Sequence, residues 1–225
     1  MEEKDLVKII QVKESVFEDN NADAARFREE LKAKKTFLFN IMSSPGSGKT
    51  TTLCRIIETL KDEYSIGVLE ADIDGDVDAY TVRNAGAKAI QIHTGGMWHL
   101  DADMTRQGFN EFEGEVDIAF LENVGNLVCP AEYDTGAHKN IAILSIPEGD
   151  DKPVKYPLLF ECVDAVIINK IDTISYFDFD LDKCRKEIEA MNPKAKFFTI
   201  SAIRNEGIKE VCEWIKNEYK NWSEK

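Results

Sequence analysis

Seven short, nearly continuous apolar runs recur along the chain and constrain its fold more than any other feature. The stretches between them carry apolar residues at helical spacing, for example Leu53, Ile56 and Leu60. Continuous apolar strands are typical of a sheet that helices cover on both faces. We therefore predict an α/β fold, a doubly wound, mostly parallel, seven-stranded sheet flanked by helices. The predicted strands are Thr36–Met42, Ser65–Ala71, Ala87–Ile92, Val116–Glu122, Asn140–Ile146, Asp164–Lys170 and Lys196–Ser201.

A glycine-rich segment, "SSPGSGKTT", lies between the first predicted strand and a predicted helix. Glycines let backbone N–H groups approach phosphate oxygens, and the following helix adds its positive N-terminal end. In such a loop Lys49 can bridge the β- and γ-phosphates, and the Thr50 hydroxyl can ligate Mg²⁺. The strict form of this pattern has glycine where Ser43 stands. The predicted phosphate-binding residues are Gly46, Ser47, Gly48, Lys49, Thr50 and Thr51.

The segment "NKID", Asn169–Asp172, closes the sixth predicted strand and indicates which base is bound. A carboxylate at Asp172 can accept hydrogen bonds from N1–H and N2–H of guanine, whereas adenine N1 is itself an acceptor. We expect Asn169 to contact the base edge and the Lys170 stem to lie along the ring. Ser201 and Ala202, after the seventh predicted strand, fit a loop behind the guanine. The pattern predicts GTP and GDP as ligands and disfavours a small-molecule kinase.

Two acidic residues are predicted to complete a magnesium site. Asp72 follows the second predicted strand and Glu122 ends the fourth. Both therefore belong at the sheet edge where open α/β sheets bind ligands. We predict that Thr50, Asp72 and Glu122 hold Mg²⁺, and that Lys49, Asp72 and Glu122 serve catalysis.

The domain organisation follows from these positions. Residues 1–35 precede the first predicted strand and contain one helical pattern, with Phe27 and Leu31 on the same face. We predict an N-terminal helical appendage over residues 1–35 and a single P-loop GTPase domain over residues 36–225.

Composition excludes several classes of function. The formal net charge is −14, so the chain is not expected to bind nucleic acid over a broad surface. No apolar run reaches 18 residues, and the N-terminus lacks the pattern of a secretory signal. An odd number of scattered cysteines suits a reducing compartment. We expect a cytoplasmic protein without membrane contact. The five cysteines are Cys54, Cys129, Cys162, Cys184 and Cys212.

Four segments together resemble the HypB family, the hydrogenase nickel-incorporation GTPases, and more distantly the urease accessory GTPase UreG. The resemblance runs from about Asn20 to the C-terminus, and the segment "ENVGNLVCPAE" is its most specific part because most GTPases have D-x-x-G there. The four segments are "NIMSSPGSGKTT", "FLENVGNLVCPAEYD", "EGDDKPVKYP" and "VIINKID".

This resemblance implies a metallochaperone of the dimer-regulated class of P-loop GTPases. GTP loading and hydrolysis would alter a homodimer that holds Ni²⁺ or Zn²⁺ at its interface. The metal would pass to a partner of the HypA type and then to a nickel-enzyme precursor.

One position departs from the family pattern. Relatives carry T-G-x-x-C-H-L-D-A after the third strand, and here Trp98 replaces the cysteine. An indole N–H cannot ligate a metal, whereas a thiolate is a strong ligand for Ni²⁺ and Zn²⁺. The candidate ligands that remain are His99 and Cys129, which two copies of the chain could combine into a four-ligand site. The alternative is a HypB-like switch that serves another metalloenzyme or binds no transition metal, with Trp98 packed at a dimer interface.

Overall fold

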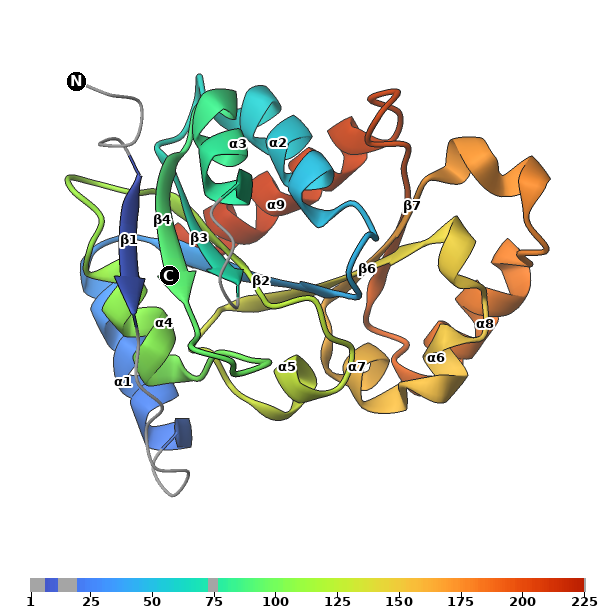
Figure 1. Cartoon of the computed structure of the whole chain (residues 1–225), viewed down its shortest axis with the longest axis horizontal. Helices are drawn as coiled ribbons and strands as arrows, with labels where there is room; N and C mark the ends of the chain where they lie inside the picture. The colour runs from blue at the N-terminus through green and yellow to red at the C-terminus, as the bar shows by residue number, and fades with distance from the viewer. Residues whose placement is uncertain (1–6, 12–19, 73–76, 225) are drawn as a thin grey trace.

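The computed structural model describes residues 7–11, 20–72 and 77–224, and within them the strands form one eight-stranded sheet (Figure 1). Neighbouring strands are all parallel, in the order β1-β4-β3-β5-β2-β6-β7-β8. This is the predicted doubly wound α/β architecture. The strands are β1 (Lys8–Gln11), β2 (Phe37–Ser43), β3 (Ile66–Asp72), β4 (Lys88–His93), β5 (Ile118–Glu122), β6 (Lys139–Ser145), β7 (Ala165–Asn169) and β8 (Lys196–Thr199).

The predicted number of strands was wrong by one. All seven apolar runs form strands, but β1 adds an eighth, which pairs in parallel with β4 at the sheet edge. β1 is only four residues long, and its partner lies about eighty residues further along the chain, where Lys8 pairs with Ile90. A run of four residues is too short to show an alternating hydrophobic pattern in the sequence. It forms a strand because its backbone pairs with the edge of β4.

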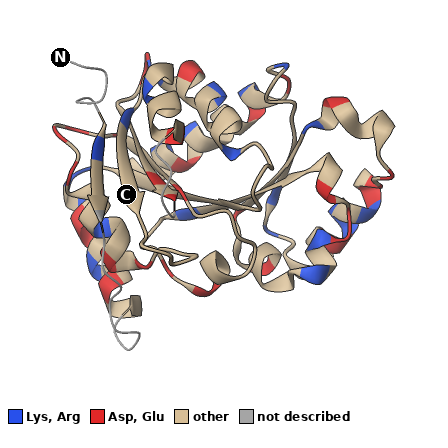
Figure 2. Cartoon of the chain, viewed as in Figure 1, with Lys and Arg blue, Asp and Glu red and all other residues tan. Residues whose placement is uncertain are grey.

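Helices cover both faces of the sheet (Figure 1). One face carries α2, α3 and α9, and the other carries α1 and α4 over β3 and β4, with α7 and α8 over β6 and β7. Acidic and basic residues are interspersed along α1 and α8 (Figure 2). In the described part of the chain, no helix has the length and apolar content needed to cross a bilayer. The helices are α1 (Asn20–Ala33), α2 (Lys49–Leu60), α3 (Val77–Ala85), α4 (Ala102–Phe109), α5 (Cys129–Glu132), α6 (Lys152–Lys155), α7 (Pro157–Cys162), α8 (Leu181–Met191) and α9 (Ile208–Ser223).

Helix α1 packs into the core. Phe27 and Leu31 are fully buried, and the Phe27 ring meets that of Phe109 edge-on at 5.7 Å between centroids. On the polar side, the Arg28 guanidinium donates to the Ala137 carbonyl at 3.1 Å. The helix predicted within residues 1–35 therefore shares its core with the main body, as β1 shares the sheet; residues 1–6 and 12–19 of that predicted appendage lie outside the described residues.

The packing of α1 predicts that Phe27→Ala destabilises the whole fold by about 3–5 kcal/mol, the usual cost of emptying a buried aromatic site. The matched control is Glu29→Ala, two residues away on the exposed side of the same helix. Urea unfolding of both variants measures the difference. A single transition with an unchanged midpoint in Phe27→Ala would show that α1 is a detachable appendage.

Candidate functional site

The phosphate loop has the geometry that its sequence predicts. It leaves β2 at Ser43 and enters α2 at Lys49, with Gly46 and Gly48 in the left-handed region at φ +77° and +93°. Ser43 stands at the position of the missing glycine, and its hydroxyl lies 2.6 Å from that of Ser47. Both serines are fully buried. The side chain at position 43 therefore closes the base of the loop, and the loop keeps its shape without a glycine there.

Asn169 attaches the guanine segment to the phosphate loop. Its amide nitrogen donates to the Ser47 carbonyl at 3.0 Å, and its amide oxygen accepts from the Ala202 N–H at 3.2 Å. A Cβ on Gly48 would lie 2.4 Å from the Asn169 amide nitrogen, so only glycine allows this approach. Both ends of the Asn169 amide are thus engaged within the protein. Its contact with the base edge stays a prediction.

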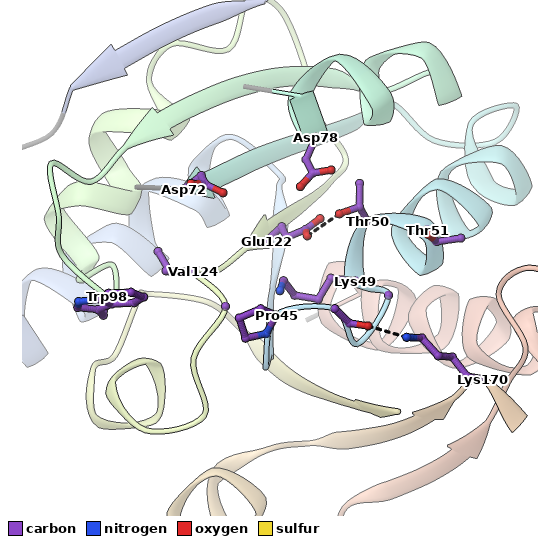
Figure 3. A pocket seen from close by; sticks show the side chains of 13 residues that line it. Pro45, Lys49, Thr50, Thr51, Asp72, Asp78, Trp98, Glu122, Val124 and Lys170 are labelled. Atoms are coloured by element: carbon purple, nitrogen blue, oxygen red, sulfur yellow. Dashed lines mark hydrogen bonds between the residues drawn. The ribbon is translucent and has the colours of Figure 1, made fainter. Parts of the chain in front are cut away.

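The other predicted guanine residues gather beside Asn169. Lys170, with φ +62°, reaches back and donates from Nζ to the Gly46 carbonyl at 2.6 Å (Figure 3). The carboxylate of Asp172 accepts from the Ser201 hydroxyl at 2.6 Å, and Arg204 Nε lies 3.9 Å from its second oxygen. These contacts orient the carboxylate that we expect to read the base. Sequence reasoning missed Arg204, because nothing in its immediate neighbours marks it.

Lys49, Thr50, Asp72 and Glu122 line one pocket of about 590 Å³ together with the phosphate loop and Lys170 (Figure 3). The Thr50 hydroxyl donates to one Glu122 oxygen at 2.9 Å. The other oxygen of that buried carboxylate has no hydrogen-bond partner among the described residues. An orphaned carboxylate oxygen beside a threonine hydroxyl is a donor set that Mg²⁺ fits.

Two acidic side chains near this pocket were missed. Asp78, in the first turn of α3, lines the pocket beside Thr50. Glu70 lies on β3 directly opposite Glu122 on β5 and is 3% exposed. Burial, followed by the charge of Glu122, raises the pKa of Glu70 well above its usual value. Burial also raises the pKa of Glu122, against the opposing effects of the neighbouring Glu70 carboxyl and the charge of Lys49. Of the two carboxyl groups, Glu70 has the more strongly raised pKa, which favours the protonated form on Glu70.

A ladder of three amide side chains crosses the sheet beneath the predicted magnesium site. Asn40 on β2 donates to Asn140 on β6 at 3.1 Å and accepts from Asn123 at 3.1 Å. Asn123 in turn accepts from the Val124 N–H at 2.9 Å. Asn40 and Asn123 are each 1% exposed, and Val124 lines the nucleotide pocket. The ladder therefore holds the segment that follows Glu122 from inside the core.

The predicted metal ligands lie in two segments that meet. His99 is buried, and its ring stacks on Tyr133 at 3.6 Å between centroids with 13° between planes. Tyr133 directly follows α5, whose first residue is Cys129. Trp98 is 53% exposed and lines the nucleotide pocket instead. Asp101 caps α4, accepting from the Met104 N–H at 2.8 Å.

Within the described residues, no group of three or more His, Cys, Asp or Glu side chains is placed to hold a metal ion. His99 and Cys129 of one protomer therefore need further ligands from elsewhere. Three other cysteines lie in helices, and burial raises the pKa of Cys54 and Cys212 to about 11 and that of Cys184 to about 12. Such thiols stay protonated at neutral pH and are poor ligands.

Comparison with known proteins agrees with this geometry. Residues 37–199 match the family model described as the CobW/HypB/UreG nucleotide-binding domain. A hydrogenase maturation factor HypB of Azotobacter chroococcum is 40% identical over 94% of this chain and 70% of its own length. The chain belongs to the HypB family.

Two further HypB proteins match this chain over most of their own length. The hydrogenase/urease maturation factor HypB of Helicobacter hepaticus is 40% identical over 92% of this chain and 87% of its own length. The crystal structure of HypB from Helicobacter pylori in complex with nickel superimposes with a TM-score of 0.85 at 36% identity, covering 90% of this chain and 96% of that one. The HypB fold is therefore present over nearly the whole chain.

The amide ladder predicts that Asn40→Leu weakens both the fold and the nucleotide site. Leucine matches the size of asparagine but leaves the buried Asn123 amide without its partner, at a cost of about 1–3 kcal/mol. Urea unfolding and nucleotide titration measure the two effects. The control is Asn217→Leu on the exposed side of α9. Equal stability of the two variants would mean that the ladder contributes nothing.

Proposed function

We propose that this chain binds GTP with Mg²⁺, hydrolyses it, and assists nickel insertion during the maturation of nickel hydrogenase. The observation that carries the proposal is the joined pocket, in which the Asn169–Ser47 and Lys170–Gly46 hydrogen bonds tie the guanine segment to the phosphate loop. A phosphate loop alone is compatible with many nucleotides, whereas this attachment places a base-reading carboxylate at a set position beyond the phosphates. The maturation role is supported by the names of the relatives.

On the phosphate side, the chain's residues have distinct roles in this proposal. Lys49 and the loop N–H groups hold the phosphates, and Thr50, Asp72 and Glu122 hold Mg²⁺, with Asp78 close by. Magnesium supplies charge neutralisation between the β- and γ-phosphates when it is bound. Glu70 stays protonated and thereby leaves the negative charge on Glu122. Hydrolysis would release the hold on the strand ends that carry Asp72 and Glu122, which would make the pocket a switch.

The nickel cargo would bind between two protomers in the GTP state. The solved HypB of Helicobacter pylori is a nickel complex, which supports nickel as the cargo, with zinc as the other candidate. His99 and Cys129 from each copy would supply two imidazoles and two thiolates. The homodimer would act in the cytoplasm and pass the metal to a HypA-type chaperone and the hydrogenase precursor.

A second candidate function is favoured by one observation. Trp98 occupies the position where relatives keep a metal-binding cysteine, and it lines the nucleotide pocket. Under this alternative, the chain is a HypB-like GTPase that switches without carrying transition metal or serves another metalloenzyme.

The base assignment predicts that Asp172→Asn weakens GTP binding at least tenfold and improves binding of xanthosine triphosphate. Losing hydrogen bonds to a charged group costs about 1.5–3 kcal/mol, while the xanthine base presents a carbonyl that suits the amide donor. Asparagine still accepts the Ser201 hydrogen bond, so the loop is preserved. Calorimetric titration measures both affinities, with the exposed Asp178→Asn as control. Unchanged GTP affinity in Asp172→Asn would remove the guanine assignment.

The cargo site predicts that the GTP-loaded dimer retains about one nickel or zinc ion per two chains, and that His99→Ala and Cys129→Ala each abolish retention. Metal analysis combined with light scattering, with and without a non-hydrolysable GTP analogue, measures both quantities. The control is Cys162→Ala, since burial raises the pKa of that thiol to about 11 and keeps it protonated. Metal content indifferent to His99 and Cys129 would favour the second candidate function.

A further inference from the structure

The Trp98 indole lies on the magnesium side of the nucleotide pocket. It lines the pocket together with Pro45, Val124 and Gly125. Figure 3 places it near Val124 and on the side of Asp72, across the pocket from Lys170, which marks the guanine side. If nucleotide binds as proposed, a half-exposed indole in this position would lie nearer the terminal phosphate than the base. Bound nucleotide would cover part of its apolar surface, which is a favourable change.

The next residue, His99, contacts the candidate metal segment, residues 129–133. His99 is 8% exposed, and its ring stacks on Tyr133, which ends the helix that Cys129 begins. Two consecutive side chains thus contact the two sites that the proposed function must couple. The Trp98–His99 dipeptide is the shortest covalent connection between the nucleotide pocket and the candidate metal segment.

The loop that carries this dipeptide is anchored at both ends. At its start, the Thr94 N–H donates to the Asp72 carbonyl at 3.1 Å, and the Thr94 hydroxyl donates to the Met97 carbonyl at 2.7 Å. At its end, Leu100 is fully buried and Asp101 caps α4. Between these anchors, Gly95 and Gly96 have open space around them, since a Cβ added to either would meet no atom within 4 Å. Trp98 and His99 therefore lie in a short segment between two anchors, where a shift of the indole would displace the neighbouring His99 backbone.

We propose that Trp98 is a positioning residue that responds to the terminal phosphate of the bound nucleotide and, through His99, sets the His99–Tyr133 stack beside Cys129. The inference rests on the proposed GTP-dependent function and adds the contact through which nucleotide acts on the metal segment. Such coupling is reciprocal. If bound nucleotide changes the affinity of the protein for metal by some factor, bound metal changes its affinity for nucleotide by the same factor.

Tryptophan emission tests the contact without any metal. The other two tryptophans, Trp214 and Trp222, belong to α9 and pack against the core, where Trp214 meets the Phe39 ring and Trp222 meets the Phe37 ring. We expect a saturating non-hydrolysable GTP analogue with Mg²⁺ to shift the emission and reduce acrylamide quenching of the native chain, and GDP to do so less. In Trp98→Phe the nucleotide-dependent part disappears. Identical emission and quenching of the native chain with and without the analogue would overturn the proposal.

Nickel titration tests the transmission to His99. We expect the analogue to change the nickel affinity of the native chain at least about fivefold. The measured quantity is the ratio of the nickel affinities with and without saturating analogue. Trp98→Ala reduces this ratio to near one, and Trp98→Phe restores part of it. The exposed Val154→Ala control on α6 retains the full ratio. A native ratio of one, or an undiminished ratio in Trp98→Ala, would overturn the transmission.

The proposed function and the role of Trp98 fail in different ways. If the native chain binds no GTP by filter binding, the proposed function fails. If it binds and hydrolyses GTP but Trp98 emission ignores the analogue, only the role of Trp98 fails. If it binds no nickel, the metal part of the proposed function fails, and the emission experiment alone decides whether Trp98 contacts the nucleotide.

Discussion

The hydrogen bond from the Asn169 amide to the Ser47 carbonyl is the contact on which the nucleotide pocket depends. It joins the end of β7 to the phosphate loop after β2, across the intervening strand β6. The contact requires glycine at position 48, since a side chain there would occupy the place of the amide. With Asn169 2% exposed, water does not compete for this bond. Under the proposed function, the distance between the base-reading and phosphate-holding groups would therefore be set by the sheet.

The sheet also brings together the acidic groups at its edge. Glu70 and Glu122 are neighbours only because β3 pairs with β5, a register that joins residues about fifty positions apart in the sequence. Two carboxyl groups this close in a dry environment cannot both carry a charge. Glu122 contacts Thr50 and is the better placed of the two for a cation, so the proton belongs on Glu70. The strand pairing thus shapes the charge of the pocket as well as its geometry.

The seven main strands, the phosphate loop and the guanine segment could be predicted because each is a local pattern with its own physical cause. The strand β1, the burial of Phe27 on α1 and the pairing of Glu70 with Glu122 could not, because each depends on what another part of the chain presents. Asp78 was missed for the same reason, since its place in the pocket follows from how α3 packs. Local patterns therefore predicted a nucleotide-binding domain, and tertiary contacts supplied the groups that surround its pocket.

Replacing the family's cysteine with Trp98 changes more than the number of metal ligands. A thiolate at this position would act toward the metal, whereas the indole has no ligand atom to offer and lies at the nucleotide pocket. The neighbouring His99 keeps its place against Tyr133. One protomer then offers only His99 and Cys129 among the described residues, so a four-ligand site would need a second copy. Under the proposed function, dimerisation and metal retention would therefore be a single event, and Trp98 would couple both to the nucleotide.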